Sequence, residues 1–88
     1  MIDEIKLILR ISKDTKTFDD EILGLVDACK VDMKLAGVTN VDLGNALVKQ
    51  AIKIYCKAYF GSNPDSEKYK LSYEHIKKSL ALAGDING

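Results

Sequence analysis

The spacing of apolar residues between positions 18 and 36 limits the fold of this chain more than any other feature. These residues recur every three or four positions, the period that places side chains on one face of an α-helix. The line consists of Phe18, Ile22, Leu25, Cys29, Met33 and Ala36. Acidic residues crowd the predicted first turn, where they oppose the positive end of the helix dipole, and Gly37 is a typical C-terminal cap. The stretch therefore predicts a long amphipathic helix.

Two further segments show helical periodicity. Residues 42–60, which are followed by Gly61, carry a wide apolar arc. We therefore expect this helix to be the central element. Another helix is predicted to begin after Pro64, with Asp65 or Ser66 as its cap, and to stop at Gly84. Its apolar line is Tyr69, Tyr73, Ile76, Leu80 and Ala83.

The N-terminal residues 2–11 fit two patterns. Apolar positions 5, 7, 9 and 11 alternate as in a strand, whereas positions 2, 5, 8 and 9 share one side of a helix. No other segment provides a strand for pairing, so we predict a helix. The chain has 88 residues, and we expect an all-α, four-helix single domain over residues 1–88. Its predicted core contains Phe18, Ile22, Leu25, Cys29, Ile52, Tyr55, Tyr73, Ile76 and Leu80.

Charge and composition argue against several functional classes. Thirteen basic and thirteen acidic residues give zero formal net charge, which disfavours wrapping of nucleic acid and a polybasic membrane anchor. Charges interrupt residues 1–11, so we expect neither a signal peptide nor a membrane span there. Cys29 and Cys56 lie in apolar helical patterns without metal-ligand spacing, and we expect both to be buried packing residues.

Reactive groups are poorly placed for catalysis. The single histidine, His75, has no nucleophile at a suitable helical spacing, and a packing or surface role explains it better. The acidic run from Asp19 to Glu21 diverges by about 100° per residue on a helix and cannot converge on one ion. No phosphate-binding loop is present. We predict no catalytic residue, no cofactor and no metal site, and we do not expect an enzyme.

A row of lysines marks the polar strip of the predicted central helix. Lys49, Lys53 and Lys57 are spaced four apart, and no acidic residue lies between positions 43 and 63. The row is either an ordinary solvated face, a basic strip near DNA, or a contact with an acidic strip of another copy of the chain.

A second apolar line runs along the helix predicted at residues 18–36. It consists of Gly24, Ala28, Val31 and Leu35, well around the helix from the line that begins at Phe18. Two apolar lines imply either burial on two sides within the domain or a contact with another molecule. The small residues would let another backbone approach closely.

The order of these signals resembles the small head-tail connector family of tailed bacteriophages, also called head completion, adaptor or DNA-packaging proteins. The N-terminal half contributes Ile2-Asp3-Glu4-Ile5-Lys6, Leu9-Arg10-Ile11, Phe18-Asp19-Asp20-Glu21-Ile22, and Asp32 with Ala36-Gly37-Val38. The C-terminal half contributes Ala51-Ile52-Lys53 with Tyr55, Lys57, Ala58, Phe60 and Gly61, the pair Tyr69 and Tyr73, and Leu80.

The resemblance implies a structural subunit that assembles as a homo-oligomeric ring beneath the portal protein of a filled capsid. Such a ring extends the DNA channel and docks a tail-proximal connector or stopper protein. It implies a virion location after synthesis in the host cytoplasm, possible non-specific contact with packaged DNA, and no membrane partner. A small helical DNA-binding or regulatory protein is the alternative, and a small hydrolase or transferase is a third class without a nucleophile-base pair.

Overall fold

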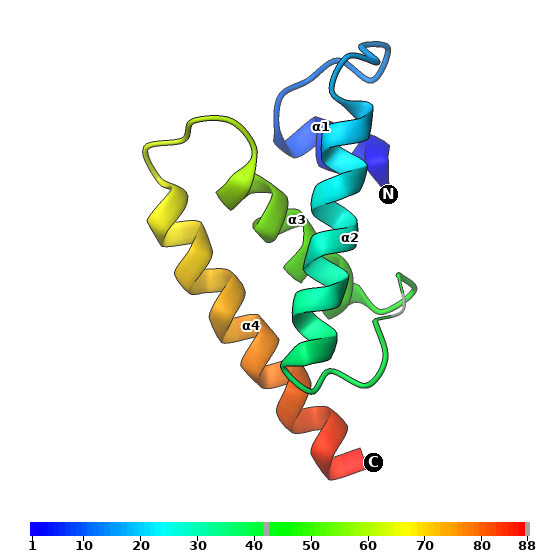
Figure 1. The fold of residues 1–88 in the computed structure, drawn as a ribbon, viewed down its shortest axis with the longest axis vertical. Coiled ribbons are helices and arrows are strands. Elements are labelled where there is room, and N and C mark those ends of the chain that lie inside the picture. The colour runs from blue at the N-terminus through cyan, green and yellow to red at the C-terminus, as the bar shows by residue number, and fades with distance from the viewer. Residues whose placement is uncertain (42, 88) are drawn as a thin grey trace.

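The protein folds into four α-helices. The computed structural model describes residues 1–41 and 43–87, and the helices are α1 (Ile2–Ile8), α2 (Asp19–Leu35), α3 (Ala46–Tyr59) and α4 (Ser66–Asn87). Within these two ranges the chain forms no strand (Figure 1). The predicted all-α, four-helix fold is therefore confirmed, including the helical interpretation of the N-terminal segment.

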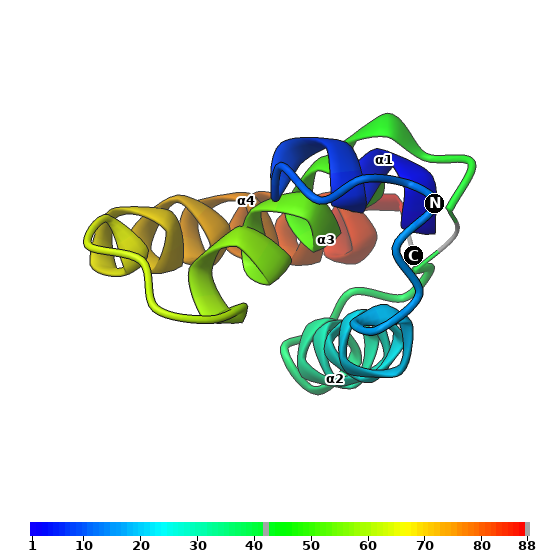
Figure 2. The ribbon, with the colours of Figure 1, turned by 90° about the horizontal axis from the view of Figure 1, so that it is seen from above.

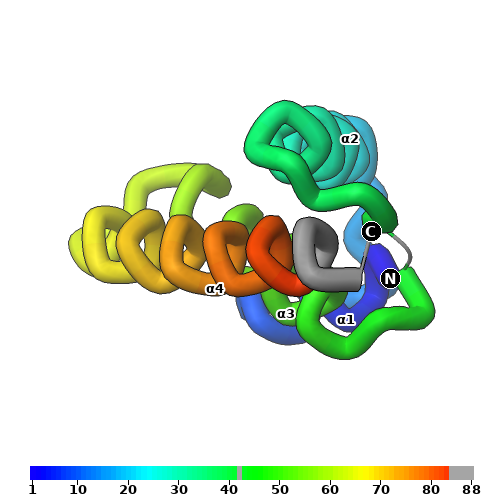
Figure 3. Tube along the Cα trace, turned by 90° about the horizontal axis from the view of Figure 1, so that it is seen from below, coloured from blue at the N-terminus to red at the C-terminus, as the bar shows by residue number. Residues whose placement is uncertain are grey.

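Helix α3 is the central element, as predicted. It packs against α1, α2 and α4, and its most extensive contact is with α4. Seen along the long axis from above and from below, α2 lies to one side of α1, α3 and α4 (Figures 2 and 3). One side of α2 therefore faces the other helices, and the opposite side is left uncovered by them.

The start of α3 and the end of α4 differ from the predicted bounds. Asn45 caps α3, and its side-chain oxygen accepts hydrogen bonds from the backbone amides of Leu47 and Val48 at 2.8 and 3.3 Å. Asp42, where we predicted the start of this helix, lies outside the described residues. Helix α4 continues to Asn87, so the predicted stop at Gly84 is wrong. A glycine weakens a helix but ends it only where the backbone adopts a left-handed conformation.

The ends of α1 and α2 share one hydrogen-bond arrangement. After α2, the amides of Gly37 and Val38 donate to the carbonyls of Lys34 and Met33, and Gly37 has a φ of 101°. After α1, Arg10 occupies the equivalent left-handed position with a φ of 61°. A left-handed conformation suits glycine and is costly for arginine, because it brings the β-carbon close to the backbone.

Most of the predicted core is buried. Ile22, Cys29, Ile52, Tyr73 and Leu80 are confirmed as core residues, whereas Leu25, Tyr55 and Ile76 are half-buried. Both cysteines are buried as predicted, and burial raises the pKa of Cys29 to about 12 and that of Cys56 to about 11.

Phe18 is the exception to the predicted core. It is 38% exposed because it precedes α2 as the N-cap residue and lies at the edge of the fold. Its ring packs edge to face against Phe60, with centroids 5.4 Å apart. Val26 completes the buried side of α2 instead, giving a line of Ile22, Val26, Cys29 and Met33.

Lys6 ties α1 to the loop that leads into α2. Its side chain is 1% exposed, and its Nζ lies 2.6 Å from Oδ1 of Asp19. The same ammonium group donates hydrogen bonds to the backbone carbonyls of Lys13 and Thr15 at 3.2 and 2.7 Å. One buried charge therefore forms an ion pair with a carboxylate and hydrogen bonds with two loop carbonyls, and Asp19 at the start of α2 has a partner besides the helix dipole.

A network of polar side chains ties α2 to α4. The hydroxyl of Tyr73 donates to Oδ2 of Asp32 at 2.5 Å, and Nζ of Lys77 lies 2.9 Å from the same oxygen. Burial favours the neutral carboxyl, but these two hydrogen bonds outweigh it and lower the pKa of Asp32. Burial, followed by the bond to Asp32, raises the pKa of Tyr73.

Removing the ammonium group of Lys6 should destabilise the fold. Lys6→Met keeps the length of the side chain but leaves Asp19 and two loop carbonyls without their donor, so we expect a loss of about 3 kcal/mol in the free energy of unfolding. Lys16→Met, at an exposed position, is the control. Denaturant titration measures both, and equal losses would contradict the role of Lys6.

The lowered pKa of Asp32 predicts a contribution to stability that depends on pH. The folded-state pKa lies below the ordinary value of 3.8, so the contribution is present above that value and is lost as the pH falls through the folded-state pKa. Asp32→Asn should therefore flatten the decline of unfolding free energy between about pH 5 and pH 2, whereas Asp27→Asn, on the exposed side of α2, should not. Denaturant titrations across this range provide the measurement, and parallel declines would contradict the assignment.

Candidate functional site

The second apolar line of α2 is exposed to solvent. Gly24 and Ala28 are exposed, as are Val31 at 57% and Leu35 at 83%. A β-carbon added at Gly24 would meet no atom within 4 Å. Leu23, which the sequence analysis did not assign to this line, is also 49% exposed. Burial within the domain is thus excluded as the reason for this line, which leaves contact with another molecule as the open alternative.

The lysine row is partly neutralised within the chain. Glu4 of α1 reaches across to α3, and its two carboxylate oxygens lie 3.0 Å from Nζ of Lys49 and 3.0 Å from Nζ of Lys53. Hydrogen bonds from Lys49 and Lys53 lower the pKa of Glu4. Although no acidic residue lies between positions 43 and 63, two of the three lysines therefore face an acid from another helix. Glu4 is 45 residues from Lys49, and no helical spacing could have indicated the pairing.

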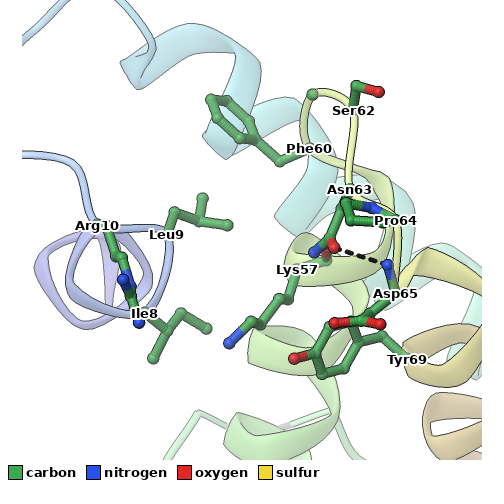
Figure 4. A pocket seen from close by; sticks show the side chains of 11 residues that line it. Ile8, Leu9, Arg10, Lys57, Phe60, Ser62, Asn63, Pro64, Asp65 and Tyr69 are labelled. Atoms are coloured by element: carbon green, nitrogen blue, oxygen red, sulfur yellow. Dashed lines mark hydrogen bonds between the residues drawn. The ribbon is translucent and has the colours of Figure 1, made fainter.

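Lys57, the third lysine of the row, lies apart from this pairing. Its Nζ is 5.0 Å from the centre of the Tyr69 ring, a cation–π contact. It also lines a groove of about 550 Å³, with Arg10 on the opposite wall (Figure 4). We call this groove the Arg10–Lys57 groove. Neither periodicity nor spacing in the sequence indicated that Arg10 and Tyr69 border a common groove.

Among the residues that the structure describes, groups with metal-binding potential are not gathered at one site. His75 is exposed on α4, and Asp19 pairs with Lys6. Across the two described ranges, no three His, Cys, Asp or Glu side chains are placed to hold a metal ion. None of the helices, as far as they are described, has the length and apolar content needed to cross a membrane.

The fold and its surfaces define a class of protein. It is a small all-α fold that leaves an apolar face of α2, and a groove lined by apolar, cationic and acidic side chains, open to solvent. Helix α3, which carries the lysine row, packs on the three other helices.

The family follows from the comparison with known proteins. A family model described as "Phage connector protein" matches residues 1–87, and the chain belongs to this family. No curated protein and no solved structure matches the chain. It is a structural protein of a bacteriophage, a head-tail connector, and membership of the family implies interaction with virion components such as portal or tail proteins. The same membership suggests a virion location and a non-enzymatic role.

The pairing of Glu4 with two lysines can be tested directly. In a Lys49→Gln, Lys53→Gln double variant, the pKa of Glu4 should rise toward its ordinary value of 4.5, because the hydrogen bonds that lower it are gone. Lys57→Gln is the matched control and should leave Glu4 unchanged. Carbon-13 NMR of the Glu4 carboxyl carbon during a pH titration measures both. An identical titration in the double variant and the parent would contradict the pairing.

Proposed function

We propose that this connector is the subunit of a homo-oligomeric ring at the head–tail interface. The ring lies beneath the portal protein, extends the DNA channel and docks a tail-proximal connector or stopper protein. The exposed second line of α2 is the observation that carries the proposal, because membership of the connector family supplies the setting and this line supplies a surface for subunit contact.

The chemistry of the α2 line suits a contact between proteins. Fully burying a side chain such as Val31 or Leu35 contributes about 1.5–3 kcal/mol, and a ring repeats that contribution at every contact. Gly24 and Ala28 add little side-chain volume, so a neighbouring backbone can approach closely. Gly24, Ala28, Val31 and Leu35 are accordingly our proposed subunit interface.

The lysine row is our proposed contact with DNA or a partner. Lys49 and Lys53 are 36% and 26% exposed and together face one carboxylate, so this part of the row keeps an excess of positive charge. Such a surface would attract phosphates of packaged DNA through charge, without reading sequence. Lys57, without a carboxylate partner among the described side chains, is the member of the row best placed for a protein contact.

The ring proposal predicts the effect of placing a charge on the α2 line. Ala28→Glu should fold with an unfolding free energy within about 0.5 kcal/mol of the parent, since the position is exposed. In a ring the same carboxylate would be buried without a partner, and incorporation into particles that contain the portal should fall by about tenfold or more. Quantitative mass spectrometry of purified particles measures the incorporation.

Ser72→Glu is the matched control, because it adds the same charge at an exposed helical position on α4. It should be incorporated like the parent. Normal incorporation of Ala28→Glu would contradict the proposed interface, and so would an equal loss in both variants. Failure of the unmodified protein to enter the particles would contradict the proposed function itself.

A further inference from the structure

We infer that the Arg10–Lys57 groove of one subunit receives the exposed face of α2 from the next copy of the same chain. The inference rests on the proposed ring, and it names the surface that covers the α2 line. The contact would then join two different surfaces, α2 on one copy and the groove on its neighbour.

The groove combines apolar side chains with two cations, Arg10 and Lys57, and one carboxylate, that of Asp65. Ile8, Leu9 and Arg10 at the end of α1 line one side, and Lys57, Tyr69 and the segment that follows α3 line the other (Figure 4). Neither Arg10 nor Lys57 pairs with a carboxylate among the side chains that the structure describes. Two cations against one carboxylate leave the groove with a net positive charge, so it suits a segment that carries an acidic group. The side chains of Ile8, Leu9 and Phe60 in its walls favour protein over DNA as the occupant.

The exposed face of α2 has this chemistry. Asp27 lies one helical turn from Leu23 and one turn from Val31, and all three side chains are exposed. Asp27 has no ion-pair partner within the described part of the chain. Docked in the groove of a second copy, Leu23 and Val31 would meet the apolar walls while Asp27 meets Lys57 and Arg10.

The left-handed backbone conformation of Arg10 supports a role for its side chain. The residue holds a left-handed conformation with a φ of 61°, a position that glycine occupies with less strain and does occupy after α2. The side chain of Arg10 is exposed and borders the groove. A counter-ion on the neighbouring subunit gives this arginine a role that glycine could not perform.

The geometry of such a contact leads to a ring. The groove is built from α1, α3, the segment after α3 and the start of α4, and none of its lining residues belongs to α2. Each copy therefore has both surfaces available at once. A contact between two unlike surfaces repeats from copy to copy and closes into a ring when the rotation allows it.

Charge reversal tests this contact. Asp27→Lys and Lys57→Glu should each reduce incorporation into portal-containing particles by about tenfold or more, because like charges then face each other at every contact. The Asp27→Lys, Lys57→Glu double variant should recover incorporation to within about threefold of the parent, since opposite charges are restored. A mixture of the two single variants should also recover incorporation. In a ring in which the two variants alternate, every contact brings one lysine against one carboxylate.

If mixing restores incorporation, the single variants are defective in a contact between subunits. A defect within one subunit would not be restored by mixing. Lys78→Glu, an exposed charge reversal on α4, is the control and should behave like the parent. If Lys57→Glu fails to fold by circular dichroism, Arg10→Glu replaces it in the same series, because that side chain is exposed. Single variants that are incorporated normally, or a double variant and a mixture that both fail, overturn the inference. Neither result affects the proposed ring, which is tested by Ala28→Glu.

Discussion

Burial of α3 against the other three helices is the constraint on which the rest of the structure depends. Its buried residues point toward α1, α2 and α4, and they include the small residues Ala51 and Ala58 alongside Val48, Ile52 and Cys56. Because α3 lies against each of the other helices, each of them needs to bury only one side. That arrangement leaves the outer side of α2 available for contact with other molecules.

Two polar attachments hold α2 in place at its opposite ends. Lys6 binds Asp19 and the loop before the helix, while Asp32 near the other end accepts hydrogen bonds from Tyr73 and Lys77. Between these points the contact with the core is apolar. A helix fixed at both ends presents its outer residues in one orientation, which lowers the entropic cost of binding a partner.

Periodicity predicted the helices well because it depends on neighbours within one segment. Periodicity could not predict features that depend on residues far apart in the sequence. Glu4 pairs with lysines of another helix, and Phe18 lies at the edge of the fold as the N-cap residue of α2. Periodicity also placed Gly24 and Leu35 on one line but could not say what covers them. The resemblance to phage connectors came from the order of motifs along the chain, and the family match confirms it.

The central position of α3 also has a consequence for how the chain loses its structure. Its amide protons are protected by packing on three sides, so we expect them to exchange with solvent only when the whole domain unfolds. Helix α1 is only 7 residues long and is followed by the strained Arg10, so its amides should exchange through smaller openings. Since α1 forms one wall of the Arg10–Lys57 groove, binding of a neighbour there would slow that local exchange and extend the cooperative unit from one subunit to the next.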